Sequence, residues 1–515
     1  MAYTADRRRL IPRRMIPWIA AAVAILVAVG ISVLVATGTL GRLARDRVVK
    51  VLKQHYGAGL QFKNLTVRLF PQVRVEATDL TFRQPGRPDT PPLITIQKLS
   101  AVTSPMEALR APPRVREVRL EGLRIQVSRR GESGPHPKKQ GGKKPPDFVI
   151  DSVLADGTQL TVIPRKEGKP PLEFDIRRLR LTGAGPSQPM SFRATLRNAK
   201  PPGDIQTVGQ FGPWEKDAPG DTPVTGRYTF RDADLSVFRG ISGKLASDGN
   251  YRGTLDHIEV DGQTDVPDFT VKVSGNPVHL TTKFHAIVDG TDGDTYLQPV
   301  DAQVGESRIL AKGSIEGVKG VKGKTVSLDV DTNGRLQDIL RLGTKGQPPM
   351  SGAIRFHTKL VIPPGDVDIA EKLHLDGAFR IDDARFTKLD IQQKINDLSH
   401  RGKGRPEELK TDMVASDFTG RFALNQGQIR FQRLSFCVPG VGVALAGRYG
   451  ILDEAMDFHG KATLEAKVSE TTTGWKSVLL KAVDPFFHKK DAGAVIPFHV
   501  GGTRDHPTFG LDLHK

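Results

Sequence analysis

The fold class of this chain is decided by residues 118–127, which read Val118-Arg119-Leu120-Glu121-Gly122-Leu123-Arg124-Ile125-Gln126-Val127. Apolar and polar residues alternate on both sides of an expected turn at Glu121-Gly122, a pattern typical of strands with one buried and one solvated face. The same alternation recurs at 65–69, 80–83, 179–181, 271–273, 326–330, 354–356 and 429–431. The sequence therefore predicts a mainly β protein.

One-sided strands need a cover for their apolar face, and helical periodicity is confined to short segments at 44–55, 104–107, 390–401 and 473–483. A second sheet, closure into a barrel, or a curved trough lined by an apolar ligand would each satisfy the pattern. We therefore expect one N-terminal transmembrane helix, then extended antiparallel β-sheets that form a curved groove, a sandwich or an open barrel, with a few short helices.

Composition agrees with many turns and short strands, since the 515 residues include 53 glycines and 36 prolines. A single cysteine, Cys437, excludes an intrachain disulfide framework. The net charge of +18 raises the question of nucleic acid or an anionic membrane surface as partner. Basic residues cluster only in the N-terminal arm and at 129–144, so we expect most of the charge on exposed strand faces and no nucleic-acid partner.

Residues 15–37 carry no charged side chain, and as a helix they would span ~34 Å, enough to cross a bilayer. Five arginines precede them, and the positive-inside rule then places the N-terminus in the cytoplasm and the body on the far side. A cleaved signal peptide ending near Ala36-Thr37-Gly38 is the alternative. The predicted anchor residues are Ile16, Trp18, Ile19, Val23, Leu26, Val29, Ile31 and Leu34, and the predicted cytoplasmic basic flank is Arg7, Arg8, Arg9, Arg13 and Arg14.

The predicted organisation is a basic arm (1–14), the anchor (15–38), an N-terminal β-rich section (39–200), a Pro/Gly-rich connector (201–224) and a C-terminal β-rich section (225–515). A basic, almost apolar-free loop at 129–147 interrupts the first section. This loop is either a solvated insertion or a contact for anionic lipid headgroups.

A lone amphipathic helix is predicted from Thr473 to Val483, with Thr473 as N-cap. Its apolar face is made by Trp475, Val478, Leu479 and Ala482. Such a helix could close the open end of a trough or lie on a membrane surface. We expect it to cap the groove, because a helix this short offers little apolar area to a bilayer.

Catalytic and ligand-binding motifs give no positive indication. The chain has no nucleophile elbow, phosphate loop or paired-histidine helix, and Gly440-Val441-Gly442 lacks the third glycine of a dinucleotide site. Residues 289–294 predict Asp-Gly turns rather than a calcium loop, and Cys437 is expected to be a small buried side chain. We expect His499, His506 and His514 to line strands and turns. No catalytic residue, cofactor or metal site is predicted, and the protein is not expected to be an enzyme.

Several turn motifs resemble those of the AsmA family of bacterial envelope proteins. They are Val67-Arg68-Leu69-Phe70-Pro71 before Val73-Arg74-Val75, Gly240-Ile241-Ser242-Gly243-Lys244-Leu245, Val288-Asp289-Gly290-Thr291, Val438-Pro439-Gly440, and Gly501-Gly502-Thr503-Arg504-Asp505-His506-Pro507. The resemblance covers most of the chain and implies an inner-membrane anchor, a periplasmic body and a role in outer-membrane biogenesis. Relatives are likened to bridge-like lipid transfer proteins, whose β-groove carries acyl chains, although this chain is shorter than the bridge-forming members.

The expected function is therefore the handling or transfer of phospholipids by a non-enzymatic protein anchored in the bacterial inner membrane, with possible envelope protein partners. The alternative is an envelope scaffold with closed β-sandwich cores and no lipid cargo. The two differ in whether inward residues such as Leu120, Ile125 and Val127 are enclosed by a second sheet or line an apolar channel.

Overall fold

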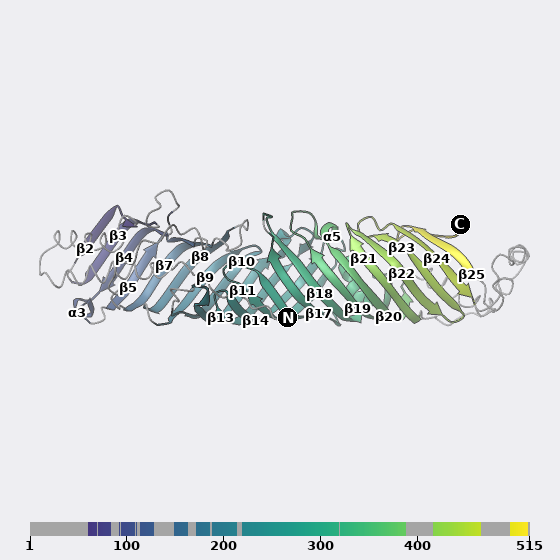
Figure 1. Ribbon diagram of the computed structural model, residues 1–515, viewed down its shortest axis with the longest axis horizontal. Coiled ribbons are helices and arrows are strands. Elements are labelled where there is room, and N and C mark those ends of the chain that lie inside the picture. Colours follow the sequence, from purple (N-terminus) through teal and green to yellow (C-terminus); the bar gives the residue numbers. More distant parts are fainter. Residues whose placement is uncertain are drawn as a thin grey trace, which may run out of the picture.

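The computed structural model describes residues 60–68, 71–83, 92, 94–108, 110, 114–127, 149–162, 171–185, 188–213, 219–318, 320–387, 416–464 and 495–512. These residues form a mainly β body, in which 26 strands belong to a single long, curved sheet and the helices are few and short. Figure 1 shows the strands following one another along the body in chain order, oblique to its long axis. The prediction of extended, mostly antiparallel β-sheet is confirmed.

The N-terminal strands are β1 (Leu60–Gln61), β2 (Asn64–Arg68), β3 (Val73–Phe82), β4 (Ile94–Thr103), β5 (Arg114–Glu121), β6 (Arg124–Val127), β7 (Val149–Val162), β8 (Leu172–Ala184) and β9 (Met190–Ala199). The central strands are β10 (Pro202–Phe211), β11 (Pro223–Asp234), β12 (Ile241–Ser242), β13 (Lys244–Thr254), β14 (His257–Val271), β15 (Pro277–Val288), β16 (Thr295–Val304), β17 (Ser307–Gly317) and β18 (Lys324–Arg335). The C-terminal strands are β19 (Met350–Ile362), β20 (His374–Phe386), β21 (Ser416–Asn425), β22 (Gln428–Val438), β23 (Val441–Gly450), β24 (Met456–Leu464), β25 (Val495–Gly502) and β26 (Pro507–Leu511). Short helical segments are α3 (Pro105–Ala108), η2 (Pro219–Asp221), η3 (Leu235–Val237), α4 (Leu336–Gly343) and α5 (Ile369–Lys372).

Strand order follows chain order. From β7 onward each strand pairs antiparallel with the next, apart from short β12, which pairs with β14 beside β13. Near the N-terminus, β1 and β2 both pair with β3. The strands β5 and β6 lie between β4 and β7 and run parallel to β7. Successive links therefore alternate between the two long edges of the sheet from β7 to β26.

The predicted turn at Glu121-Gly122 is wrong, because β5 and β6 continue in line rather than folding back on each other. Both pair with β4 and with β7. Gly122 has a φ of +61° and lies in register with Gly157 of β7, whose φ is +66°. The pairing with β4 and β7 stays in step through Gly122, but the left-handed backbone there changes which face the following side chains occupy, so Leu120 and Leu123 are both buried although their numbers differ in parity.

The register between neighbouring strands is irregular at several places along the sheet. The register shifts between β8 and β9, β11 and β13, β14 and β15, β15 and β16, β16 and β17, β19 and β20, β21 and β22, and β22 and β23. Bulges increase the local right-handed twist of a sheet. A sheet with bulges at many strand pairs coils instead of lying flat.

The predicted connector at 201–224 differs from the structure, in which residues 202–211 are strand β10, paired with both β9 and β11. The prolines mark strand ends rather than a linker: Pro202 and Pro223 are the first residues of β10 and β11. Proline is tolerated there because a first strand residue need not donate a ladder hydrogen bond.

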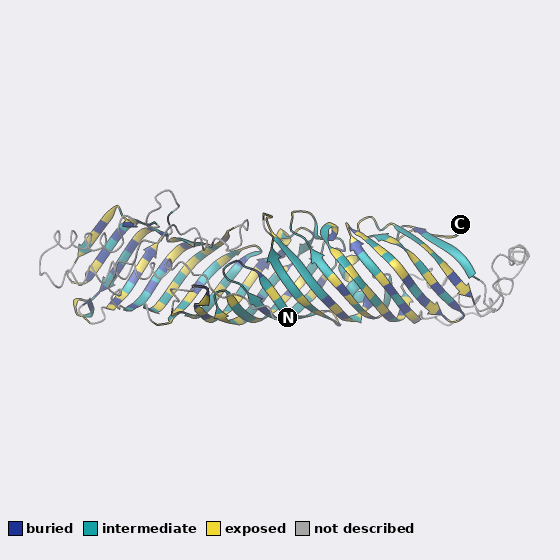
Figure 2. Cartoon of the chain, viewed as in Figure 1, coloured by how far each residue is buried: buried dark blue, intermediate teal, exposed yellow. Residues whose placement is uncertain are grey.

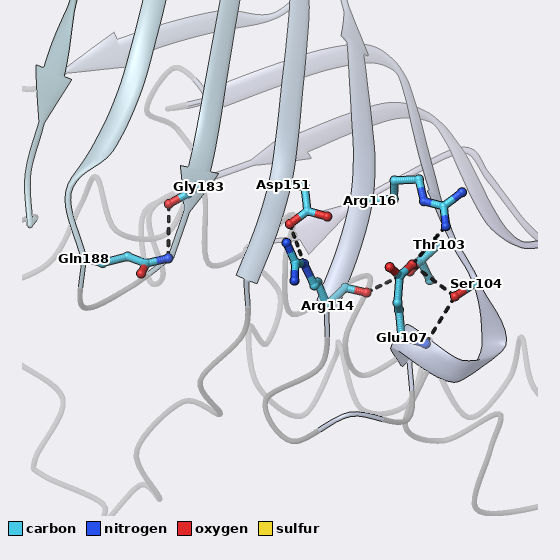
Figure 3. A network of polar contacts seen from close by, with 8 residues as sticks. All are labelled: Thr103, Ser104, Glu107, Arg114, Arg116, Asp151, Gly183 and Gln188. Carbon is cyan, nitrogen blue, oxygen red and sulfur yellow. Dashed lines mark hydrogen bonds and ion pairs between the residues drawn. The ribbon is translucent and has the colours of Figure 1, made fainter.

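The predicted helix start at Ser104 is confirmed and forms α3. Ser104 Oγ accepts a hydrogen bond from the Glu107 backbone N–H (3.2 Å) and donates one to the Glu107 carboxylate (3.0 Å). These hydrogen bonds to Ser104 lower the pKa of Glu107. Figure 3 shows this cap beside the Arg114–Asp151 ion pair, which ties β5 to β7 at 2.6 Å.

Within the described residues, no helix has the length and apolar character needed to cross a membrane. Several predictions lie outside those residues. They are the anchor at 15–38 with its basic flank, the basic loop at 129–147, the helices at 44–55 and 390–401, and the helix at 473–483 with Trp475, Val478, Leu479 and Ala482.

Candidate functional site: an apolar lining inside the coiled sheet

One face of the sheet is apolar and the other is charged, and the strand registers show the division directly. Between β22 and β23, Phe436 lies opposite Val443 on one face, whereas Arg430 lies opposite Arg448 on the other. Phe436 and Val443 are buried, whereas Arg430 is exposed. Ion pairs of the second face, such as Arg308 with Asp301, are largely solvent-exposed, so much of the basic charge of the strands faces water.

The apolar face is tightly packed towards both ends of the described body, where Figure 2 shows most of the dark blue. The N-terminal cluster comprises buried residues from β1 to β8, with Leu80 and Leu99 fully inaccessible. The C-terminal cluster is rich in phenylalanine: the rings of Phe418 and Phe436 stack with centroids 5.1 Å apart. Dense packing of this kind stabilises the two ends as conventional cores.

Between these clusters much of the same face is only half-buried. In β14, β15 and β18 the lining side chains Ile258, Val260, Phe284 and Leu328 are all of intermediate exposure. All described strands belong to one sheet, so among them no second sheet covers this face. Water can therefore reach an apolar lining in the middle of the body.

The three residues chosen to distinguish a channel from a sandwich lie near the packed N-terminal end. Leu120 is 4% exposed, and Ile125 is half-buried against the N-terminal cluster. The side chain of Val127 lies outside the described part of the structure. The residues that distinguish an open channel from a closed sandwich are therefore those of β13 to β18.

Opposite long edges of the sheet meet at two places. The Ile369 backbone N–H, in the link from β19 to β20, donates to the Arg239 carbonyl in the link from β11 to β13 (3.0 Å). The Arg504 guanidinium, in the link from β25 to β26, donates to the Lys345 carbonyl in the link from β18 to β19 (2.7 Å). Across the sheet seven strand positions lie between the joined links in both cases, β13 to β19 and β19 to β25, if short β12 is counted with β13, beside which it pairs with β14. Because links on opposite edges touch, the sheet wraps around itself and encloses its apolar face.

The first of these contacts depends on a glycine. Gly240 has a φ of +97°, and a Cβ there would lie 2.4 Å from Asp368 Oδ1. Asp368 in turn caps α5 by accepting from the Ala370 N–H (2.9 Å). The first motif residue of Gly240-Ile241-Ser242-Gly243 thus permits the close approach of the two edges.

The half-buried lining is uncharged apart from one residue at its edge. In the registers from β13 to β18, the positions on the same face as Val260 and Leu328 are aliphatic, aromatic, glycine and hydroxyl residues. The exception is Lys324, the first residue of β18, whose Nζ donates to the Gly293 carbonyl. The hydroxyls pair with one another, as in Thr264 with Thr282 (2.6 Å) and Tyr228 with Ser247 (3.1 Å). Burial raises the pKa of Tyr228, which keeps the phenol neutral. A largely apolar lining whose hydroxyls mostly face one another suits hydrocarbon, although the buried Thr332 Oγ1 has no hydrogen-bond partner among the described residues.

Two open hollows lie mainly on the charged face and not in this lining. The first, about 530 Å³, is bordered by Arg227, Asn250 and Arg252, and the second, about 610 Å³, by Arg308, Arg355 and His357. Their walls are exposed side chains of neighbouring strands. They are shallow surface features of a twisted sheet.

Other sequence predictions can be placed within the described residues. Residues 289–294 form the turn between β15 and β16, where Asp289 Oδ1 accepts from the Thr291 N–H and Asp294 Oδ1 accepts from the Gly317 N–H. The prediction of a turn is confirmed. The prediction that Cys437 is buried is wrong: it lies on β22 as expected but is exposed, because Phe436 and Val438 occupy the apolar face on either side of it.

Sequence reasoning missed one cluster, in which His459 and His499 lie opposite each other on β24 and β25 beside Asp457. His499 was expected only to line a strand. The cluster depends on strand register between segments about forty residues apart, which no local motif encodes.

These features define a class of protein by architecture: a single coiled sheet with a neutral, apolar interior and a charged exterior. Comparison of the chain with models of protein families, with curated proteins and with solved structures finds no match in any of the three.

Proposed function

We propose that this protein is a non-enzymatic carrier of phospholipids in the bacterial envelope. In this proposal residues 15–38 anchor it in the inner membrane with the N-terminus in the cytoplasm, and the β body lies in the periplasm and serves outer-membrane biogenesis. The observation that carries the proposal is the apolar lining from β13 to β18, which is uncharged apart from Lys324 at its edge. This lining is enclosed by the coiled sheet, yet many of its side chains remain half-exposed. The turn motifs that resemble the AsmA family point the same way.

The physical argument concerns what such a lining would hold. Exposed apolar area costs about 25 cal/mol per Å² in water, so an interior of half-exposed aliphatic and aromatic side chains is stabilised when hydrocarbon fills it. An acyl chain needs no hydrogen-bond partner, and the hydroxyl pairs Tyr228–Ser247 and Thr264–Thr282 of this lining already satisfy one another. Strands about 4.8 Å apart extend the sheet over a distance on the order of 100 Å, longer than any one lipid. Several acyl chains could therefore occupy it in series.

The test compares two neighbouring residues of β17 that lie on opposite faces. Ile309 belongs to the lining and is half-buried, whereas Leu310 is 37% exposed on the outer face. The full chain would be extracted gently from membranes and analysed by native mass spectrometry and lipid extraction. We expect co-purified phospholipid in the wild type, several-fold less in Ile309→Glu, and wild-type amounts in Leu310→Glu.

Absence of phospholipid from the wild-type protein would overturn the proposal. It would favour the alternative of an envelope scaffold without lipid cargo, for which the packed ends of the sheet would be the functional parts. Circular dichroism of both variants must match the wild type, so that loss of lipid is not loss of fold.

A further inference from the structure

A cluster of two histidines and two aspartates lies on the charged face at the C-terminal end of the sheet. His459 of β24 and His499 of β25 are directly opposed in the antiparallel register, with ring centroids 4.6 Å apart. Asp457 precedes His459 by two positions and so projects from the same face, and Asp512 follows β26. Two paired strands and the residue that follows a third strand thus bring four potential ligand groups together.

The facing atoms have the spacing of a metal site. Asp457 Oδ1 lies 3.2 Å from His459 Nε2 and 3.0 Å from His499 Nε2. One ligand atom from each residue lies within 4.8 Å of the others. Bonds of about 2.0–2.1 Å in a tetrahedral zinc site separate neighbouring ligand atoms by ~3.3 Å, so small side-chain rotations would accommodate the ion.

The surrounding groups orient these ligands. Asp512 Oδ2 is 2.7 Å from His459 Nδ1, which fixes the ring with Nε2 towards Asp457. The Arg448 guanidinium lies 3.2 Å from Asp457 Oδ2 and leaves Oδ1 turned to the two imidazoles. A carboxylate behind a ligating histidine is the usual outer-shell support of a metal centre.

We propose that Asp457, His459 and His499 bind a divalent transition-metal ion such as Zn²⁺, with Asp512 as a positioning residue. The three ligand side chains are between 38% and 57% exposed, which leaves room for water to complete the coordination. The ion would join β24 to β25 on the outer face. This site is separate from the apolar lining and does not depend on lipid binding.

The chain offers internal controls, because other histidines on the charged face pair with one aspartate only. His357 Nδ1 lies 2.8 Å from Asp331, and His285 Nδ1 lies 2.8 Å from Asp261. Within the described residues, no other group of three or more histidine, cysteine, aspartate or glutamate side chains has ligand atoms this close. A variant of a lone His–Asp pair is therefore a matched control: it tests whether any exposed histidine beside one aspartate binds the metal.

The experiment is equilibrium dialysis of the detergent-purified, chelator-treated full chain against Zn²⁺, followed by Co²⁺ titration with absorption spectroscopy. We expect about one tightly bound equivalent and a cobalt spectrum of nitrogen–oxygen coordination. Affinity should fall at least ~10-fold in His499→Ala and in His459→Ala, less in Asp512→Asn, and not at all in His357→Ala. The proposal is overturned if the double variant His459→Ala/His499→Ala binds as much Zn²⁺ as the wild type, or if His357→Ala lowers binding equally.

Discussion

The N-terminal and central parts of the sheet share one sequence pattern but pack differently. In β3, β4 and β5 the apolar face is closed, and Leu80, Leu99 and Val118 are all 0% exposed. In β14 to β18 the same alternation leaves many lining side chains only half-buried, such as Val260 and Leu328, beside smaller buried ones such as Ala286. The pattern of alternation therefore fixes which face turns inward, whereas the coiling of the sheet decides how much space remains inside.

Glycines contribute to this difference. The central lining includes Gly249 and Gly262, which lie opposite each other in register and carry no side chain to fill the interior. A Cβ on Gly262 would lie 2.6 Å from the ring of Phe284, and one on Gly249 would lie 2.9 Å from the ring of Tyr228. The aromatic rings thus lie flat across neighbouring glycines instead of projecting inward. The N-terminal cluster is built instead from interlocking Leu, Ile and Val.

The largest expected effect tests whether the two regions differ in packing energy. Leu99→Ala in the closed region should lower the free energy of unfolding by ~3 kcal/mol or more, because it leaves a cavity in a filled core. Leu328→Ala in the half-open lining should cost ~1 kcal/mol, since its side chain already borders accessible space. Denaturant unfolding of the two variants, followed by hydrogen exchange in β4 and β18, measures both. Equal losses would mean that the central lining is as tightly packed as the N-terminal core.

A smaller effect is expected where the edges of the coil meet. Gly240→Ala places a Cβ against Asp368 at a backbone angle that alanine rarely adopts, and should cost ~1–3 kcal/mol. We expect faster hydrogen exchange at Ile369 and its neighbours in α5, because the edge contact is lost first. The control is Gly343→Ala, at the end of α4, where a Cβ meets nothing within 4 Å. If both variants exchange alike, the edge contact does not hold the coil.

The smallest expected effect is a pH dependence of fold stability that arises from His459 at the C-terminal end. The hydrogen bond to Asp512 raises the pKa of His459 above its ordinary value near 6.5. The protonated ring therefore stabilises the fold below the unfolded pKa, and this contribution is lost as pH rises through the folded pKa. NMR titration in the presence of chelator should give a higher pKa for His459 in the wild type than in Asp512→Asn. If the pKa of His459 is the same in Asp512→Asn as in the wild type, Asp512 is not the cause of the raised pKa.

Much of the fold could be predicted from the sequence, because alternation is local. The strand at Val326–Val330 and the cap at Ser104 follow from short-range patterns. The predicted turn at Glu121-Gly122 is wrong because β5 and β6 keep one continuous register against β4 and β7, which the local sequence does not reveal. The error on Cys437 was avoidable, since period two places Cys437 and Phe436 on different faces of β22. By contrast, the Arg504–Lys345 contact and the His459–His499 pair join residues that are distant in the chain, and only the register and coiling of the sheet bring them together.

The two edge contacts are each separated by seven strands, and this spacing has a consequence for how such a body could grow. The bore of the coil is set by how many strands make one wrap, whereas its length is set by how many hairpins follow one another. Each hairpin adds about 10 Å across the strands and borders only its immediate neighbours and the strands one wrap away. Duplication or loss of hairpins would therefore lengthen or shorten the passage while keeping its width, so an architecture of this kind can be fitted to a given span in small increments.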